Sequence, residues 1–535
     1  MPIIPINNLA EVGIITDKLP MQLESNAWTA GKNVRFSDNN VQKTTGWEEY
    51  LDTGLNWDGG SGEQVYWAIP YNYLTTPLWV YAGLKDVRVY DGVSDKEITN
   101  VSGFYAASAQ TNWTGGILSD ILVINNGVDL PQSWDGDFSL PTKLIDLANF
   151  SSQAERCGAL RVYKNYLIAL DVTKSNVRYK SLVKWSDSAA LGELPASWDA
   201  TDATTDSGET DLSEKTKDVN VGALIDCLPL RNTNIVYSDS QVWAMDFIGG
   251  QFVFNFRQIF KNNGILSARC VQEFEGKHFV VGNGDVYVHD GNTLKSVIDA
   301  KRRRFLFSDM DSTLYRTTYV FANYPEKEMW VCYAQEGSTS GLPNKALIWN
   351  WMNGTWGQKD LPEGPVTNPY GTPHVSSGIV DTSLTSDAWS IITESWLTVD
   401  RVWDSGGFRP QEQSPLLCAN KLYKGDTSNT HDGTPMVSFV ERTDIPMGED
   451  DVTVRIKALY PKMAGSSGVN VYVGSHKAPG DPPSYGAPVL FTPGTSKKVD
   501  IRKTGTHMAV KFESTESQSW SLYGYDVEIE PTGRR

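Results

Sequence analysis

The sequence predicts an all-β protein, with a β-propeller of about six blades followed by a C-terminal β-sandwich. Aromatic residues make up 11 % of the 535 residues, and such residues suit a pleated, half-buried sheet surface. Almost no window of a dozen residues keeps the apolar spacing of an amphipathic helix. Short runs that alternate apolar with polar residues recur instead, separated by turn residues. Together these features favour many small antiparallel sheets.

The predicted propeller spans residues 46–425 and is marked by a repeated turn. An aromatic residue or a histidine ends a strand, and Asp or Asn follows it, often with Gly. The markers are Tyr90-Asp91-Gly92, Trp134-Asp135-Gly136, Trp185-Ser186-Asp187, the weaker Met245-Asp246-Phe247, His289-Asp290-Gly291 and Trp351-Met352-Asn353-Gly354. Their spacing, mostly about 45 to 60 residues, is that of four-stranded blades. The alternative is a set of ordinary hairpin turns, which any β protein contains.

Two insertions are expected to distort this repeat as long solvated loops. They lie near residues 198–217, rich in Asp, Thr, Ser and Glu, and near residues 362–385, rich in Pro, Gly, Ser and Thr. A β segment from about Ala388 to Cys418 could form a last blade or a strap that closes the ring. Residues 426–535 then hold about six alternating strands, which predict the β-sandwich.

Charge and cysteine usage narrow the function classes. The formal net charge of -17 repels nucleic-acid phosphates, so sequence-specific DNA binding is not expected. The five cysteines stand singly, which favours buried free thiols over a disulfide framework or a zinc site. The segment Met1–Leu9 carries no Lys or Arg, so no secretory signal is expected, and no apolar stretch approaches the ~18 residues of a membrane span.

A search for catalytic chemistry finds no constellation, and no enzyme, cofactor or metal is predicted. The six histidines are far apart and are expected to be satisfied strand or loop residues. There is no Gly-x-Ser-x-Gly elbow and no phosphate-binding loop. Pairs such as Asp309 and Asp311 could hydrolyse a glycosidic bond, but 64 Asp and Glu residues make such pairs easy to find. The run Lys301–Arg304 is the stronger interaction candidate, although such runs are usually solvated.

Two segments carry a family resemblance. The first comprises Leu19-Pro20, Asn26-Ala27-Trp28, Gly31 to Phe36, Asn40 to Lys43 and Gly46-Trp47, and the second comprises Val454 to Pro461, Asp500 to Gly505, Trp520, Gly524 to Glu528 and Gly533-Arg534-Arg535. Both resemble the tail nozzle proteins, or tail tubular B proteins, of short-tailed bacteriophages (podoviruses). The resemblance implies that residues 1–45 form an extended arm that leads into the first blade.

The resemblance further implies a structural virion protein, made in the bacterial host cytoplasm and built into the viral tail. A homo-oligomeric ring, hexameric by this resemblance, would line the exit channel for double-stranded DNA and contribute to DNA ejection. Tail adaptor proteins, tail fibres or spikes and the host outer surface are the implied partners. Arginine forks suit contacts with carboxylates of a neighbour, so the candidate interface residues are Trp28, Arg35, Arg302, Arg303, Arg455, Arg502 and Arg534. Pairing within a domain is the alternative at each arginine, and a propeller hydrolase or lyase, or a glycan-binding receptor module for envelope polysaccharide, is the alternative function.

Overall fold

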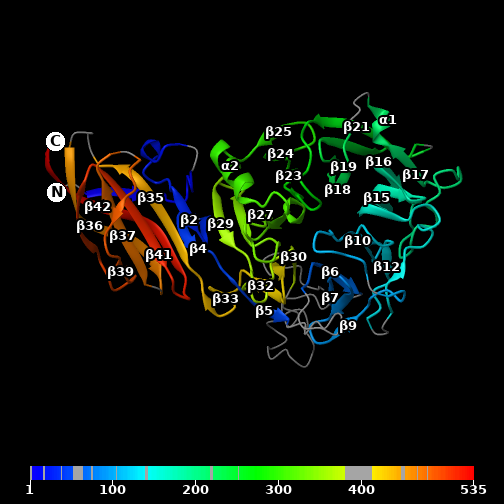
Figure 1. The fold of residues 1–535 in the computed structure, drawn as a ribbon, viewed down its shortest axis with the longest axis horizontal. Coiled ribbons are helices and arrows are strands. Elements are labelled where there is room, and N and C mark those ends of the chain that lie inside the picture. Colours follow the sequence, from blue (N-terminus) through cyan, green and yellow to red (C-terminus); the bar gives the residue numbers. More distant parts are fainter. Residues whose placement is uncertain are drawn as a thin grey trace, which may run out of the picture.

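The protein consists of a β-propeller and a β-sandwich that lie side by side (Figure 1). The computed structural model describes residues 3–15, 18–37, 39–51, 64–73, 76–103, 105–138, 142–216, 221–250, 252–379, 413–447, 452–466, 468–478 and 480–534. In these ranges the only α-helices are α1 (Leu212–Lys215) and α2 (Ala300–Asp309), with short 3-10 turns η1 (Pro20–Gln22) and η2 (Tyr315–Thr317). Neither described helix is long and apolar enough to cross a membrane. The all-β class and the propeller are confirmed.

Six blades are four-stranded antiparallel sheets whose strands follow one another along the chain. Blade 1 holds β6 (Trp67–Tyr73), β7 (Thr76–Ala82), β8 (Val87–Tyr90) and β9 (Asp95–Glu97), and blade 2 holds β10 (Thr114–Leu118), β11 (Ile121–Asn125), β12 (Gln132–Trp134) and β13 (Ile145–Asp146). Blade 3 holds β14 (Arg156–Tyr163), β15 (Tyr166–Lys174), β16 (Val177–Trp185) and β17 (Gly208–Asp211), and blade 4 holds β18 (Leu224–Leu230), β19 (Thr233–Ser238), β20 (Gln241–Phe247) and β21 (Phe254–Lys261). Blade 5 holds β22 (Val271–Phe274), β23 (Lys277–Val281), β24 (Val286–His289) and β25 (Leu294–Ser296), and blade 6 holds β26 (Tyr319–Asn323), β27 (Glu328–Tyr333), β28 (Lys345–Asn350) and β29 (Trp356–Asp360).

The predicted turn marker lies at the same place in all six blades, at or just after the end of the third strand. Where the marker contains Asp-Gly, the carboxylate accepts hydrogen bonds from the turn. Asp290 Oδ1, for example, accepts from the backbone N–H of Asn292 and Thr293 at 2.9 and 2.7 Å. The glycine adopts a positive φ of 91° at Gly291, which a side chain would strain. The common position of the marker is therefore a true structural repeat.

A seventh blade closes the ring, one more than the six that the sequence predicts. Its strands are β30 (His374–Ile379), β31 (Gln413–Cys418), β32 (Leu422–Gly425) and β5 (Trp47–Leu51), and the short β33 (Thr430–His431) and β34 (Thr434–Pro435) extend its sheet. Because its fourth strand comes from the other end of the propeller sequence, this blade has no third-to-fourth-strand turn and no marker. The segment from about Ala388 to Cys418, which the sequence left as either a last blade or a strap, thus ends in a blade strand. Its residues 388–412 lie outside the described ranges.

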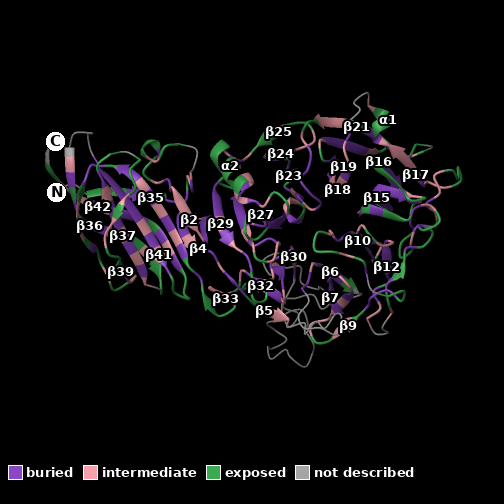
Figure 2. Ribbon diagram, viewed as in Figure 1, coloured by how far each residue is buried: buried purple, intermediate pink, exposed green. Residues whose placement is uncertain are grey.

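Apolar clusters between neighbouring blades hold the propeller together, as the aromatic markers predict. Trp134 of blade 2 packs against Tyr71 of blade 1 with ring centroids 5.5 Å apart, and Trp351 of blade 6 packs against Phe274 of blade 5 at 5.4 Å. One cluster joins Leu416 of blade 7 to Val65 and Trp79 at blade 1, and the inner strands β30 and β6 are in contact there. Figure 2 shows buried residues along the strands of both bodies.

The two predicted insertions are more ordered than expected. The first contains the buried Trp198, the outer strand β17 of blade 3 and helix α1. The second contains β30, the inner strand of blade 7, while its residues 380–385 lie outside the described ranges. Their polar composition hid these elements because β17 and β30 themselves contain few apolar residues.

The sandwich consists of two sheets that combine both ends of the chain. One sheet has the order β3-β4-β42-β36-β40 with β1 beside β42, and the other has the order β2-β35-β41-β37-β38 with β39 beside β37. The N-terminal strands are β1 (Ile3–Asn7), β2 (Ala30–Lys32), β3 (Val34–Ser37) and β4 (Asn40–Lys43). The C-terminal strands are β35 (Ser438–Pro446), β36 (Val452–Gly465), β37 (Val469–His476), β38 (Ser484–Tyr485), β39 (Val489–Phe491), β40 (Val499–Gly505), β41 (His507–Ser514) and β42 (Trp520–Arg534).

The expectation of an extended N-terminal arm is therefore corrected. Residues 1–45 supply four strands of the sandwich, and one apolar cluster joins Ile6 and Trp28 to Val454 and Phe512 across the two sheets. These N-terminal strands are short, and β1, β2 and β4 pair with strands more than 400 residues later in the chain, so their local sequence gives little sign of a sheet. The long strand β42 pairs with β1 and β4, and β35 pairs with β2.

Candidate functional site

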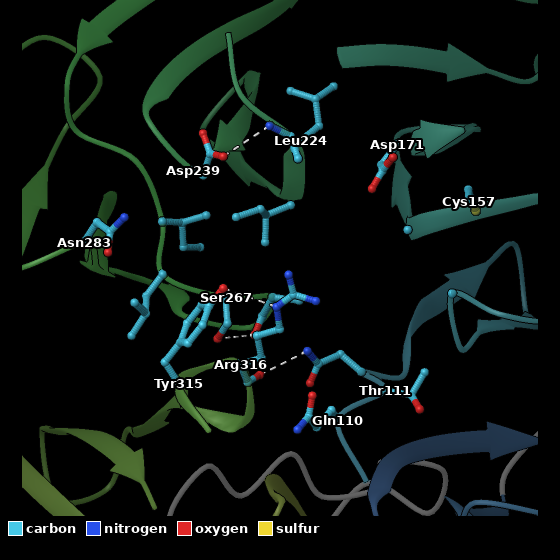
Figure 3. A pocket seen from close by; sticks show the side chains of 18 of the residues that line it. Gln110, Thr111, Cys157, Asp171, Leu224, Asp239, Ser267, Asn283, Tyr315 and Arg316 are labelled. Atoms are coloured by element: carbon cyan, nitrogen blue, oxygen red, sulfur yellow. Dashed lines mark hydrogen bonds between the residues drawn. The ribbon is translucent and has the colours of Figure 1, made fainter. Parts of the chain in front are cut away.

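A cavity of about 760 Å3 opens at one mouth of the propeller (Figure 3). Five consecutive blades, 2 to 6, surround it. The starts of β14 and β18, the segments that precede β10, β22 and β26, and the turns between the second and third strands of blades 2 to 5 contribute to its wall. Its polar lining includes Gln110, Asn112, Arg156, Asp171, Arg178, Asp239, Ser267, Asn283, Tyr315 and Arg316, and its apolar floor includes Leu224, Ile225, Ile265 and Leu266.

A buried ion pair lies beside this cavity, because its Asp226 directly follows the lining residue Ile225. Arg161 of β14 makes a two-point contact with Asp226 of β18, with both N–O distances at 2.7 Å. Burial alone would raise the pKa of Asp226, but the charge and hydrogen bonds of Arg161, together with the backbone N–H groups of Arg269 and Cys227, outweigh burial and lower it. Asp226 also accepts a hydrogen bond from the backbone N–H of Arg269 at 3.0 Å, so this pair ties blades 3, 4 and 5 together.

Arg269 is the less satisfied cation of this group. Its Nη2 donates to Asn112 Oδ1 at 2.8 Å, whereas its buried Nε and Nη1 have no hydrogen-bond partner among the described residues. Burial lowers the pKa of Arg269 to about 10. The floor of the cavity therefore lies next to a cation that is short of acceptors.

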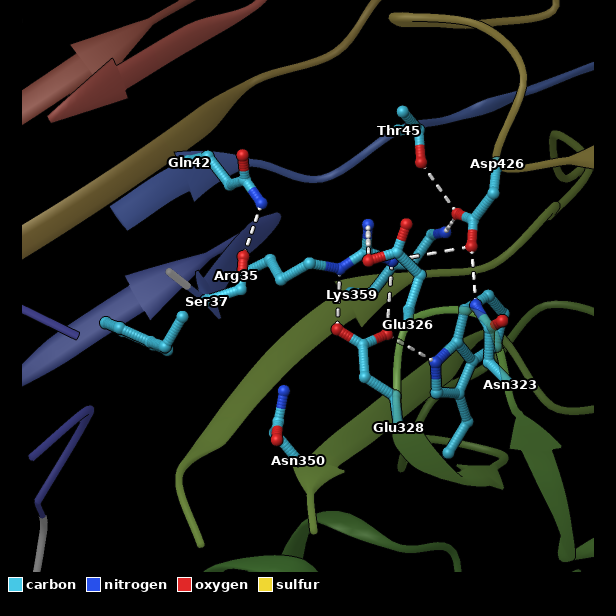
Figure 4. Close-up of polar contacts among 12 residues, drawn as sticks. Arg35, Ser37, Gln42, Thr45, Asn323, Glu326, Glu328, Asn350, Lys359 and Asp426 are labelled. Atoms are coloured by element: carbon cyan, nitrogen blue, oxygen red, sulfur yellow. Dashed lines mark hydrogen bonds and ion pairs between the residues drawn. The ribbon is translucent and has the colours of Figure 1, made fainter. Parts of the chain in front are cut away.

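The second candidate site is the junction between sandwich and propeller, where an ionic network surrounds Arg35 of β3 (Figure 4). The guanidinium contacts both oxygens of Glu328 on β27, at 2.6 and 3.1 Å, and Glu326 at 3.1 Å. It also contacts Asp426, which follows β32, at 3.4 Å. Lys359 of β29 contacts the same carboxylate at 2.9 Å. Arg35 and Glu328 are almost completely buried, so the network belongs to the interior of the protein.

The electrostatics of the junction favour the ionised state. Burial lowers the pKa of the Arg35 guanidinium, but Glu328, Asp426 and Glu326 together raise it well above its ordinary value. Burial likewise raises the pKa of Asp426, but Lys359 and Arg35 hold it far below the ordinary range. Removing one partner would leave an uncompensated buried charge, which is more costly than the pair itself.

Both connections between the two bodies pass through this junction. Thr45, on the outgoing connection, donates to Asp426 Oδ1 at 2.7 Å, and Asp426 lies at the start of the returning connection. Trp47 stacks on His431 with ring centroids 3.7 Å apart. A Cβ at Gly46 would lie 2.0 Å from the carbonyl oxygen of Thr430, so only glycine fits between the connections. The junction therefore works as a clamp rather than as a free linker.

Two more of the predicted interface residues also make contacts within the chain. Trp28 is buried in the sandwich core and donates from Nε1 to the carbonyl of Leu9 at 3.0 Å. The basic run forms the first turn of α2, not a loop, and Arg302 is buried there. Arg302 contacts Asp299 at 3.1 Å and donates to the carbonyl of Ile14, which fastens α2 to the N-terminal segment. Neither Trp28 nor Arg302 is available to a partner.

The remaining predicted residues are on the surface or outside the described side chains. Arg303 is half-exposed and lies 3.5 Å from Asp285. Arg455 on β36 and Arg502 on β40 are exposed on neighbouring strands of the same sandwich sheet. Arg534 ends β42, and its side chain lies outside the described residues. Among the candidates, Arg455 and Arg502 are the pair that the fold brings to one exposed sheet.

The candidate catalytic carboxylates make structural contacts. Asp309 accepts hydrogen bonds from Tyr333 and Gln335 at 2.9 and 3.1 Å, and Asp311 accepts from the backbone N–H of Thr313 at 2.8 Å. All five cysteines are buried free thiols, as predicted. No cluster of three or more His, Cys, Asp or Glu side chains in the described ranges is placed to bind a metal ion.

Two buried histidines confirm the expectation of satisfied strand residues. The backbone N–H of Gly291 donates to His289 Nδ1 at 3.2 Å, so His289 Nε2 carries the proton and donates to Tyr237 Oη at 2.6 Å. The hydroxyl of Tyr237 then donates to His278 Nδ1 at 2.7 Å, and His278 Nε2 donates to the carbonyl of Pro229 at 2.9 Å. We call this series of hydrogen bonds the imidazole relay. It joins blades 4 and 5, and both imidazoles are neutral in it.

Sequence reasoning missed the mouth cavity and the partners of Arg35. The cavity residues come from loops of five blades and form no motif. Glu328 does carry a signal, because it is the one charged residue of the otherwise apolar strand β27, and a charge in a buried strand requires a partner. The sequence does not reveal that this partner is Arg35, which is nearly 300 residues earlier.

The solved structures compared below are distant likenesses. No family model and no curated protein matches the chain. Among solved structures, YCF48 from Cyanidioschyzon merolae is 8% identical, with a TM-score of 0.38 and coverage of 71% of this chain and 98% of that chain. The AfRom2 CNH domain is 7% identical, with a TM-score of 0.33 and coverage of 62% and 94%. The extracellular domain of the putative one component system BT4673 from B. thetaiotaomicron is 10% identical, with a TM-score of 0.34 and coverage of 66% and 45%.

Proposed function

We propose that this chain is a non-enzymatic structural protein of a virus particle, which forms the nozzle ring at the distal end of a short bacteriophage tail. One observation supports the proposal most directly: the two segments that resemble nozzle proteins fold into a single domain. Val41 and Gln42 of the first segment pair with Leu522 and Ser521 in β42, the strand that carries much of the second. Chance matches at opposite ends of a chain would have no reason to share a sheet.

The clamped junction gives the proposal a mechanical basis. A tail component must keep its shape while DNA passes through the assembled ring. Here two β bodies are joined by two connections, and the buried network of Arg35, Lys359 and their carboxylates fixes one body against the other. A rigid unit of this kind suits a ring subunit.

The surface charge suits the other proposed roles. The net charge of -17 lets double-stranded DNA pass a wall without adhering to it. Arg455 and Arg502 are exposed cations in this acidic chain, and we assign them to contacts with carboxylates of a neighbouring copy, an adaptor protein or a fibre. Buried free thiols suit synthesis in the reducing cytoplasm of a bacterial host.

Electron microscopy of the purified protein at increasing concentration tests the proposal. We expect closed rings, six copies in each, and we expect Arg455→Ala with Arg502→Ala to reduce the ring fraction while the subunit stays folded. Mass spectrometry of purified particles should detect the chain in the tail. A protein that stays monomeric at every concentration and is absent from particles would refute the proposal.

A further inference from the structure

We infer that the mouth cavity of the propeller binds an acidic oligosaccharide, that is, a short chain of sugar rings that includes a sugar carboxylate. The inference goes beyond the proposed nozzle function and does not depend on ring assembly. It rests on the size of the cavity, on the mixture of side chains in its wall and on the balance of charge around it.

The size and the lining fit linked sugar rings. A cavity of about 760 Å3 lies within the range of sites that hold ligands of several rings. Sugar rings present hydroxyl groups at their edges and C–H groups on their faces. The amides of Gln110 and Asn283 and the carboxylate of Asp239 can each accept from a hydroxyl, and the amides can donate as well. Leu224, Ile225 and Ile265 offer apolar surface to the faces.

An aromatic ring and a guanidinium stand together at the wall, as Figure 3 shows for Tyr315 and Arg316. The Arg316 guanidinium lies 5.9 Å from the ring centroid of Tyr315, and its Nε donates to the hydroxyl of Tyr315 at 3.3 Å. This contact uses only one of the five N–H donors of Arg316. The free fork of an exposed arginine matches a carboxylate in two-point geometry.

The charged side chains that line the cavity have a small net positive charge, although the chain is strongly acidic. Three arginines and two aspartates line it. Asp171 and Arg178 neutralise each other, with Nε and Oδ1 at 2.7 Å, which leaves Arg156 and Arg316 against Asp239 alone. Glu155, next to Arg156, accepts from the backbone N–H of Asn176 at 3.1 Å. Below the floor, the Arg269 side chain lacks acceptors for Nε and Nη1 and adds positive potential. An anionic group is thus favoured over a neutral one.

Other ligand classes fit less well. A purely apolar ligand would leave the amides and charged groups at the rim without hydrogen bonds. Single-stranded nucleic acid requires a basic groove with several stacking aromatics, whereas this wall presents Tyr315 and Phe307 in a compact hollow. A sugar acid satisfies the hydroxyl-binding groups and the excess of arginine together.

Calorimetric titration of the full chain with trigalacturonate tests the inference, with maltotriose as a neutral probe of matched length. We expect trigalacturonate to bind and maltotriose to bind at least about tenfold more weakly. Arg316→Gln should weaken trigalacturonate binding about tenfold, the size of one charged hydrogen bond. Asp239→Asn should strengthen it, by about two- to threefold, because a repulsive carboxylate is removed.

Arg304→Gln provides the matched control. Arg304 is also an exposed arginine, on α2 outside the cavity, so its replacement should leave trigalacturonate binding unchanged. No trigalacturonate binding up to about 10 mM would overturn the inference. So would equal binding of maltotriose, or an Arg304→Gln effect as large as that of Arg316→Gln. All three variants change exposed side chains, and thermal unfolding would verify that each stays folded.

Discussion

The propeller and the sandwich are built from the same kind of strand but by opposite routes. In blades 1 to 6 each strand pairs with its neighbour in sequence, so a blade is a local unit. In the sandwich, β1 pairs with β42, β2 with β35 and β4 with β42, so both sheets need residues from the two ends of the chain. When strands pair with their neighbours in sequence, each blade leaves a similar pattern in the sequence, and the patterns form a repeat. When strands pair across the length of the chain, no such repeat results. The two bodies should therefore also respond differently to perturbation.

The largest expected effect is from Trp28→Ala, which would empty the centre of the sandwich core. We expect the free energy of unfolding to fall by about 3–5 kcal/mol. Hydrogen exchange measured by mass spectrometry should show lost protection at both ends of the chain, in β1 to β4 and in β35 to β42, since one core joins them.

Trp113→Ala is the matched change in the propeller. Trp113 is also buried and also donates from Nε1 to a carbonyl at 3.0 Å, that of Gly83. In Trp113→Ala, the loss of hydrogen-exchange protection should stay near blades 1 and 2. If Trp28→Ala left β35 to β42 fully protected, the two ends would not form one cooperative sandwich.

Arg35→Met tests the clamp between the two bodies. It leaves Glu328 and Asp426 without their shared guanidinium, and we expect a cost of about 3–5 kcal/mol by chemical denaturation. Adding Glu328→Leu should recover a large part of this cost, because the pair is then replaced by apolar groups. A double variant as unstable as Arg35→Met alone would show that Glu328 is not the partner that matters.

The pH dependence of stability should distinguish the imidazole relay from the junction, because the two lose their stabilising contributions over different pH ranges. The pKa values of His278 and His289 are lowered from 6.5 to about 4 and about 3, mainly by burial. Between these values and 6.5 the unfolded chain binds more protons, so the stabilisation is complete above about pH 6.5 and is lost as the pH falls toward 4. The Asp426 carboxylate, whose pKa is also lowered, loses its contribution only below its ordinary value of 3.8.

We therefore expect blades 4 and 5 to lose exchange protection before the junction does on acidification. His289→Gln removes one titrating group while its amide can still donate to Tyr237. Between pH 6.5 and 4 this variant should reduce the slope of stability against pH by up to about 1.4 kcal/mol per pH unit. An unchanged slope would exclude His289 as a source of the acid sensitivity.

The smallest expected effect on stability is from Arg455→Ala and Arg502→Ala. Both side chains are exposed, so each change should alter the free energy of unfolding by less than about 0.5 kcal/mol. Denaturant titration of the single variants measures this directly. A larger loss would mean that these arginines stabilise the sandwich itself, and they would then lose their value as probes of assembly.

The sequence predicts the fold where chemistry repeats locally and fails where partners are distant. The turn of Asp290 and Gly291 and its counterparts identify six blades because a tight turn demands these residue types. The seventh blade, the sandwich strands near Trp28 and the network of Arg35 depend on contacts across hundreds of residues. Of the candidate site, the sequence supplies Arg35 and the exposed Arg455 and Arg502, but it gives no sign of the mouth cavity, whose wall comes from loops of five blades.

The closing blade constrains the order of events on the ribosome. Strand β5 is synthesised before any blade, yet its antiparallel partner β32 emerges only after the other six blades have left the exit tunnel. The nascent chain must therefore hold Trp47–Leu51 unpaired for most of its synthesis, and β1 and β4 must wait longer still for β42. Blades 1 to 6 can form during translation, whereas the ring closes only once β32 has emerged and the sandwich is completed only once β42 is free.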